Sequence, residues 1–240
     1  MQELQSQTLS GLPIRFDRVM AVVGGGTVDG AVLAGLAARG AALVGADSGG
    51  DTIAASGFVP DAIIGDLDSI SARDGWGDQT RLLHIPEQIT TDFQKVLYST
   101  EAPVTVALGM TGKRLDHTLA ALSAVTENAT RKRVILVDEH DIALAVAGDI
   151  KFAVGAGERV SVHPLLPIDF AGSQGLLYPL DGLRLEPGGL IGTSNAATDG
   201  PFEIVPVRKD VPWLLIVHRQ HLDAMIDQLL TSQASEATAS

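Results

Sequence analysis

The sequence predicts an α/β fold, with an N-terminal Rossmann-like parallel-sheet domain over residues 1–148 and a small C-terminal all-β sandwich domain over residues 149–240. Three observations predict this organisation. Short apolar runs alternate with helical patterns in the first part, which is typical of parallel βαβ units. Short β-like runs separated by glycine and proline fill the second part, which is typical of a sandwich or barrel. Hydrophobic residues make up 45% of the chain, enough to build both cores.

Strands and helices are expected to alternate along the first domain. Short apolar runs predict strands at 19–23, 41–46, 62–64, 104–108 and 133–138. Alanine- and leucine-rich or capped segments predict helices at 28–39, 52–56, 91–99 and 115–128. The third of these helices has Thr90 or Thr91 as its cap. Because crossover connections between parallel strands are right-handed, this order predicts a single open sheet.

The second domain is expected to consist of short strands and a closing helix. The β-like runs lie at 159–163, 189–193, 202–207 and 214–217. Residues 221–230 are expected to form a helix. The sequence shows no internal repeat.

Composition excludes several classes of function. The net charge is −12 without a cluster of Lys and Arg, which argues against a nucleic-acid partner. Cysteine is absent, so disulfides, thiolate catalysis and cysteine-bound zinc are excluded. No apolar run approaches the roughly 20 residues of a membrane helix, and no targeting segment is visible. We therefore expect a cytoplasmic protein that contacts neither nucleic acid nor membrane.

The most informative motif is an acidic pair at a strand end. An apolar run ends at Gly65 and is followed by Asp66 and Asp68. At strand geometry, residues two apart point to the same side, so the two carboxylates would lie together. Such a pair needs a cation or a shared proton, and hard oxygen ligands suit Mg²⁺, which usually accompanies phosphates. The motif favours phosphoryl chemistry; the alternative is an Asp-rich turn that binds its own backbone.

Glycine-rich segments follow two of the predicted strands. In an open parallel sheet, ligands bind at the carboxyl ends of the strands, where backbone N–H groups can approach a phosphate. The candidates for this role are Gly25, Gly26, Gly109, Thr111 and Gly112. The alternative for the first glycines is a tight turn between strand and helix.

Charged residues accompany these segments. Asp47 follows the second strand, and Asp92 and Lys95 lie three residues apart, on one face of a predicted helix. Arg114 can bind phosphate in a bidentate way, and Asp116 lies at a helix start. Each also has a structural explanation, as a helix cap, a surface ion pair or a solvated charge.

Together and in this order, the segments resemble the thiamine pyrophosphokinase family. The matching segments of the first domain are ADSGG at 46–50, PDAIIGDLDS at 60–69, TDFQK at 91–95 and GMTGKRLDHT at 109–118. Those of the second domain are GLLYPL at 175–180 and GTSN at 192–195. The resemblance spans roughly residues 19–217.

The resemblance implies an enzyme that transfers the pyrophosphoryl group of ATP to the thiamine hydroxyl, giving thiamine diphosphate and AMP. It implies a homodimer in which ATP and Mg²⁺ lie on the α/β domain and thiamine lies at the dimer interface. The implied Mg²⁺ ligands are Asp66, Asp68 and Asp92. The implied ATP and transfer site comprises Asp47, Thr91, Lys95, Arg114 and Asp116. The implied thiamine contacts are Ser194, Asn195 and Trp213.

Several alternatives stay open at this point. Either Asp92 or Asp116 could accept the hydroxyl proton, and Trp213 could belong to a core instead of a binding site. The chain could be another Mg²⁺-dependent phosphotransferase or phosphohydrolase, which would release ADP or phosphate instead of AMP. It could also be a non-catalytic thiamine or nucleotide sensor, although the pair Asp66 and Asp68 argues against this because binding thiamine alone needs no metal.

Overall fold

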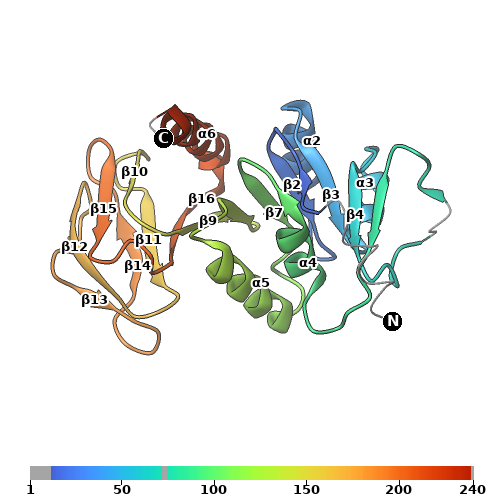
Figure 1. Cartoon of the computed structure of the whole chain (residues 1–240). Helices are drawn as coiled ribbons and strands as arrows, with labels where there is room; N and C mark the ends of the chain where they lie inside the picture. Colours follow the sequence, from blue (N-terminus) through green and yellow to red (C-terminus); the bar gives the residue numbers. More distant parts are fainter. Residues whose placement is uncertain (1–11, 72–74, 239–240) are drawn as a thin grey trace. The chain divides into compact units, whose positions relative to one another are not determined.

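The structure is a computed structural model that describes residues 12–71 and 75–238. The chain, coloured along its sequence in Figure 1, divides into two compact units. Unit 1 runs up to Ala124 and includes Leu136–Asp138, whereas unit 2 comprises Val125–Ile135 and continues from Glu139. The boundary of the two functional domains at residue 148 stays a prediction.

Unit 1 is built on five parallel strands in the spatial order β7-β2-β3-β4-β5. Their bounds are β2 (Met20–Val23), β3 (Ala42–Ala46), β4 (Ala62–Gly65), β5 (Arg81–His84) and β7 (Thr105–Leu108). Every residue of β2, β3, β4 and β7 is buried, which is why these strands read as continuous apolar runs. A separate parallel pair joins β1 (Ile14–Arg15) to β6 (Thr100–Glu101). The sequence analysis missed β5, an edge strand with one buried residue.

Helices follow the strands of this unit. They are α2 (Gly30–Ala38), α3 (Gly49–Ala55), α4 (Asp92–Ser99) and α5 (Leu115–Asn128), and the chain continues into β8 (Val134–Val137). The first helix was predicted two residues too long at its start, because the Asp29 side chain caps it by accepting a hydrogen bond from the amide of Ala31 at 2.8 Å. The second was predicted to begin at residue 52, but it begins at Gly49.

Unit 2 contains two antiparallel sets of strands, β9-β16-β11-β14 and β10-β15-β12-β13. The first set comprises β9 (Asp141–Val146), β16 (Trp213–His218), β11 (Arg159–Pro164) and β14 (Gly192–Ala196). The second comprises β10 (Ile150–Phe152), β15 (Phe202–Pro206), β12 (Ile168–Gln174) and β13 (Arg184–Leu185). The unit closes with η2 (Arg219–His221) and α6 (Leu222–Thr238). The run predicted at 189–193 is displaced to β14, and the closing helix is longer than predicted.

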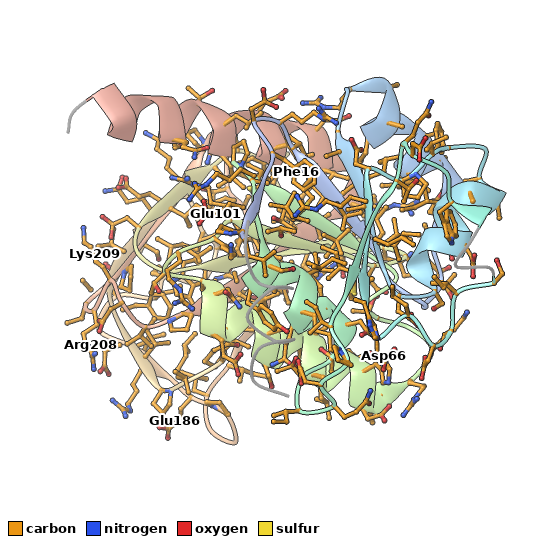
Figure 2. The ribbon with its side chains drawn as sticks, turned by 45° about the vertical axis from the view of Figure 1, so that its right-hand side comes forward. Phe16, Asp66, Glu101, Glu186, Arg208 and Lys209 are labelled. Carbon is orange, nitrogen blue, oxygen red and sulfur yellow. The ribbon has the colours of Figure 1, made fainter. Side chains whose placement is uncertain are left out.

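The core of unit 2 joins its two sets of strands. Phe170 of β12 packs edge-on against Trp213 of β16, with ring centroids 5.7 Å apart, and both side chains are buried. Charged side chains such as those of Arg208 and Lys209 point away from the ribbon, as Figure 2 shows. The predicted α/β class is confirmed as a mostly parallel sheet combined with antiparallel sheets. No helix in the described ranges is long and apolar enough to cross a membrane.

Candidate active site

A cavity of about 420 Å³ lies at the carboxyl ends of the unit 1 strands. The strand order reverses between β2 and β7, because β3, β4 and β5 extend to one side of β2 and β7 lies on the other. Ligands of open α/β sheets bind at such a switch point. Among the residues predicted from the sequence, those lining the cavity are Gly25, Gly26, Asp47, Asp66, Thr91, Asp92, Lys95, Gly109, Thr111 and Arg114.

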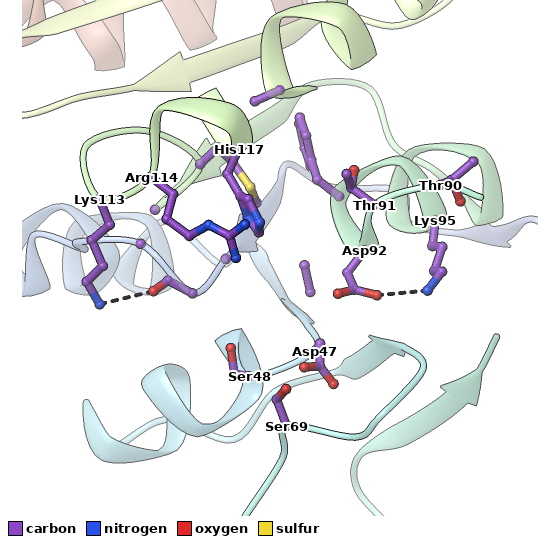
Figure 3. A pocket seen from close by; sticks show the side chains of 18 of the residues that line it. Asp47, Ser48, Ser69, Thr90, Thr91, Asp92, Lys95, Lys113, Arg114 and His117 are labelled. Carbon is purple, nitrogen blue, oxygen red and sulfur yellow. Dashed lines mark hydrogen bonds and ion pairs between the residues drawn. The ribbon is translucent and has the colours of Figure 1, made fainter. Parts of the chain in front are cut away.

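Glycine backbones form the wall of the cavity between β2 and β7. The amide of Gly26 donates to the carbonyl of Gly109 at 2.9 Å, and a Cβ atom on Gly26 would lie 2.3 Å from that carbonyl oxygen. Gly26 must therefore be glycine for the two loops to meet. The Lys113 ammonium donates to the Gly25 carbonyl oxygen at 3.1 Å, which Figure 3 marks with a dashed line. Gly112, predicted to contact the ligand, does not line the cavity.

Three carboxylates converge at the ends of β3 and β4. Asp47, Asp66 and Asp68 each offer an oxygen atom within 4.8 Å of the others. The approach depends on Gly65, because a Cβ atom there would lie 3.0 Å from the Cβ of Asp47 and 3.0 Å from Oδ1 of Asp92. The predicted metal set named Asp66, Asp68 and Asp92, whereas the convergent group contains Asp47 in place of Asp92.

Asp47 is the most constrained member of this group. Its side chain is buried, its φ angle is 47°, and its Oδ1 atom has no hydrogen-bond partner among the described residues. Burial raises the pKa of the Asp47 carboxyl, and the nearby carboxylates of Asp92 and Asp66 add to this effect. A buried oxygen without a partner, next to two more carboxylates, is the donor set that a hard divalent cation requires. The residues present therefore fit a metal ion.

Asp92 is the first residue of α4, and its carboxylate pairs with a lysine. Its Oδ1 atom lies 3.1 Å from the ammonium of Lys95, which is only 2% exposed (Figure 3). The predicted pair on one helix face is thus present, and it is part-buried instead of lying on the surface. Thr91 caps the helix: its hydroxyl accepts from the Gln94 amide, and the Gln94 side chain accepts from the Thr91 amide.

A hydrogen bond from outside the predicted motifs holds Asp66. The side-chain amide of Gln88 donates through Nε2 to Oδ2 of Asp66 at 2.6 Å. This contact is the main reason that the pKa of the Asp66 carboxyl is lowered. Gln88, Ser48 and Ser69 also line the cavity but were absent from the predicted site. Ser48 directly follows Asp47, so its position could have been inferred; Gln88 and Ser69 lie on loops whose position depends on tertiary packing.

Arg114 and Asp116 form an exposed pair beside the cavity. The Arg114 guanidinium makes two contacts to the Asp116 carboxylate, of 3.1 and 2.5 Å. This contact with Arg114 lowers the pKa of Asp116. Arg114 lines the cavity, as Figure 3 shows, whereas Asp116 does not. Of the two candidate proton acceptors, Asp92 is therefore the one that faces the cavity.

The predicted thiamine contacts lie in unit 2. Ser194 is exposed and has a φ angle of 60°. The Asn195 side chain is buried. Its amide oxygen accepts from the backbone N–H of Tyr178 at 3.0 Å, and its amide nitrogen donates to the backbone carbonyl of Tyr178 at 2.6 Å. Trp213 is fully buried in the core against Phe170, so its indole presents no surface for stacking in this arrangement. Its contact with thiamine stays a prediction.

The fold and the site define a class: an α/β protein with a cation-compatible acidic cluster and glycine loops at a sheet switch point. Residues 34–137 match the family model of the thiamin pyrophosphokinase catalytic domain. Thiamin pyrophosphokinase 1 of Caenorhabditis elegans is 33% identical over 154 residues, which cover 58% of this chain and 63% of that protein. The match thus spans less than two thirds of the relative. The resemblance drawn from the motifs is confirmed over this stretch: residues 34–137 match the catalytic domain of that family.

Solved structures show the same fold. The thiamine pyrophosphokinase of Bacillus subtilis superimposes with a TM-score of 0.70 at 20% identity, over 84% of this chain and 99% of that one. The enzyme of yeast gives a TM-score of 0.69 at 14% identity, over 87% and 92%. That of Candida albicans gives 0.68 at 17% identity, over 85% and 92%.

Proposed function

We propose that the protein is a thiamine pyrophosphokinase that converts ATP and thiamine to thiamine diphosphate and AMP. The observation that carries this proposal is the convergence of Asp47, Asp66 and Asp68 beside glycine loops in a domain of this family. In the reaction, the thiamine hydroxyl oxygen bonds to the β-phosphorus of ATP. The bond from that phosphorus to the oxygen bridging the α and β phosphates breaks, and AMP leaves.

The acidic group would hold Mg²⁺, which supplies charge neutralisation for the phosphates when bound. Asp47, Asp66 and Asp68 are the ligands that the geometry favours. Asp92 lies on the same cavity and would complete the site or accept the hydroxyl proton. Its position favours it over Asp116 as the proton acceptor.

Basic and backbone groups would position the phosphates. The glycine loops present backbone atoms to the cavity, and the side chains of Lys113, Arg114 and Lys95 surround it. Binding of a phosphate near Gly25 would give the Lys113 ammonium a stronger partner than the neutral carbonyl that it now contacts. Catalysis would consist mainly of positioning and electrostatic stabilisation.

Unit 2 would supply the thiamine side of the site as a β-sandwich domain. The packing of Phe170 against Trp213 supports a sandwich of its two strand sets. Ser194 and Asn195 would contact thiamine across the interface of a homodimer, as the family resemblance implies. The role of Asn195 includes holding the backbone of Tyr178, so it would shape the thiamine pocket as well as line it.

The decisive test is nucleotide analysis of the purified protein with ATP, Mg²⁺ and thiamine. We expect AMP that depends on thiamine, and thiamine diphosphate in equal amount. Asp66→Asn should lower the rate by about 100-fold or more, because losing a carboxylate from the cation site removes several kcal/mol of charge stabilisation. Asp78→Asn, at an exposed aspartate of unit 1, is the matched control and should keep the wild-type rate.

Other products would support the alternatives. ADP or phosphate formed without thiamine would identify a different phosphotransferase or a hydrolase at the same acidic edge. Tight binding of thiamine or nucleotide without any turnover would instead identify a sensor. A near-normal rate in Asp66→Asn would remove Asp66 from the proposed metal site.

A further inference from the structure

Residues 85–91 connect β5 to α4, and residues 86–91 of this connection are called the strap here. Glu87 organises the strap from within. Its carboxylate accepts from the amides of Ile89 at 2.7 Å and Thr90 at 3.0 Å, and also from the Thr90 hydroxyl. The hydroxyl of Tyr98, two turns along α4, donates to the same carboxylate at 3.2 Å. One side chain thus gathers four donors from the strap and the helix.

The strap carries two contacts of the proposed active site. Gln88, the residue after Glu87, donates from its side-chain amide to Oδ2 of Asp66 at 2.6 Å. Thr91 caps α4 and is followed at once by Asp92, which pairs with Lys95. The conformation of the strap therefore sets the orientation of Asp66 in the acidic cluster and the starting point of the helix that carries Asp92, which lines the same cavity.

Glu87 itself does not line the cavity in the described part of the chain. Partial burial acts to raise the pKa of Glu87, but hydrogen bonds from Thr90, Ile89 and Tyr98 outweigh it and lower the pKa from 4.5 to about 2. The group is therefore ionised at any physiological pH, and an ionised acceptor makes stronger hydrogen bonds than a neutral one.

We propose that Glu87 is a positioning residue of the active site, which fixes the strap so that Gln88 orients Asp66 for the metal ion and Asp92 starts α4 in place. The consequence for catalysis rests on the proposed function, whereas the consequence for cation binding does not. Residues that orient metal ligands through hydrogen bonds typically contribute about 10- to 100-fold to metal affinity or activity.

A purely local role gives different expectations. If Glu87 only closed a surface turn, its loss would change stability slightly and leave the metal site as it is. If it positions the strap, its loss changes cation affinity in a protein that remains folded. Two readouts separate the two roles: the affinity for Mn²⁺ alone, and the Mg²⁺ concentration that gives half-maximal AMP formation. Amide hydrogen exchange of residues 88–92 reports whether the strap itself is released.

The variants are Glu87→Ala, Glu87→Gln and Tyr98→Phe. Glu87→Ala should speed amide exchange in the strap and weaken Mn²⁺ binding about tenfold, because a freed Gln88 no longer holds Asp66. It should raise the half-maximal Mg²⁺ concentration by a similar factor. Glu87→Gln keeps one acceptor oxygen, so its Mn²⁺ affinity, strap exchange and half-maximal Mg²⁺ concentration should lie between those of Glu87→Ala and the wild type. Tyr98→Phe removes one of the four donors and should have the smallest effect.

The matched control is Glu101→Ala, at a glutamate of the same unit that is labelled in Figure 2 and whose carboxylate pairs with the exposed Arg15. It should leave all three readouts unchanged. Wild-type Mn²⁺ affinity and strap exchange in a folded Glu87→Ala variant would overturn the inference. Absence of AMP from the wild type would refute the proposed function alone, since exchange and Mn²⁺ binding still decide the role of Glu87. If Glu87→Ala does not fold, Glu87→Gln and Tyr98→Phe decide by the same readouts.

Discussion

At the scale of single residues, Asp47 has the features expected of a ligand in the proposed cation site. Its carboxyl is buried, has an unpartnered oxygen and has a pKa raised above the ordinary 3.8. Well below pH 3.8 the Asp47 carboxyl is protonated in both the folded and the unfolded chain, so the pKa shift has no effect on stability there. As pH rises above 3.8 the unfolded chain ionises this carboxyl first, so the metal-free fold loses stability until pH exceeds the raised pKa of the folded form.

Asp47→Asn should therefore separate stability from function. At pH 7 without metal, the variant should melt a few degrees above the wild type, at about 2–4 °C per kcal/mol for a chain of this size. Mg²⁺ should raise the melting temperature of the wild type but not of the variant, and AMP formation should fall by about 100-fold or more. Thermal unfolding with Mg²⁺ or with a chelator measures this, again with Asp78→Asn as control. Equal stabilisation of wild type and variant by Mg²⁺ would exclude Asp47 from the metal site.

At the scale of elements, the first turn of α3 depends on close contact with β2. A Cβ atom on Gly49 would lie 1.7 Å from the carbonyl oxygen of Val23, a backbone atom that cannot swing away. At Gly35, inside α2, an added Cβ would have no neighbour within 4 Å in the described ranges, apart from its adjacent residues and the backbone of its own helix. The two glycines therefore have opposite reasons to be present: Gly49 is required by packing, whereas Gly35 weakens its helix.

Replacing each glycine by alanine should give effects of opposite sign. Gly49→Ala should lower the free energy of unfolding by about 3 kcal/mol or more, because backbone must shift to admit the methyl group. Gly35→Ala should raise it by up to about 1 kcal/mol, the difference in helix propensity. Urea unfolding of both variants measures this. Similar stabilities for the two variants would show that α3 can move away from β2 at little cost.

The same elements show what local patterns can predict. Strands β2, β3, β4 and β7 were predicted to within one residue at either end because they are apolar and buried throughout. The start of α3 was missed because Gly49 and Gly50 disfavour a helix by propensity, and only packing on the sheet explains them. The strand β14 was displaced because it contains no large apolar residue and only one of its five residues is buried, which leaves little hydrophobic signal.

At the scale of the whole molecule, topology made the site predictable. Asp47, Asp66 and Gly109 each follow a strand, so their convergence at one sheet edge was expected, and the cavity contains all three. Gln88 and Glu87 could not be found this way, because they follow the edge strand β5 and act through contacts across the sequence. The burial of Trp213 could not be predicted from the sequence either, since the same sequence pattern fits a tryptophan in a core and a tryptophan that stacks on a ligand.

The proposed sharing of the site between two subunits can be tested by mixing two inactive variants. Asp66→Asn impairs the acidic cluster, and Asn195→Ala impairs the thiamine side. If each site takes its acidic cluster from one subunit and its thiamine contacts from the other, a mixed dimer regains one intact site. Random reassortment should then restore about a quarter of the wild-type AMP formation, since half of the dimers are mixed and each has one good site of two.

The unfractionated mixture provides this measurement. Co-purification through a different tag on each variant shows that mixed dimers exist, and these purified dimers should reach about half of the wild-type AMP formation, since one of their two sites is intact. The separate variants, assayed at the same concentration, provide the baseline. No recovery in verified mixed dimers would place each site within a single subunit.

The pairing of Asp92 with Lys95 has a consequence for how such a sequence can change. Lys95 is almost entirely enclosed, so loss of Asp92 would leave a buried ammonium without its counter-charge, at a cost of about 3–5 kcal/mol. A mutation that removes this carboxylate therefore weakens the fold as well as the proposed chemistry. We expect the two positions to vary together or not at all among descendants of this chain, so that a buried lysine would preserve a carboxylate that faces the cavity.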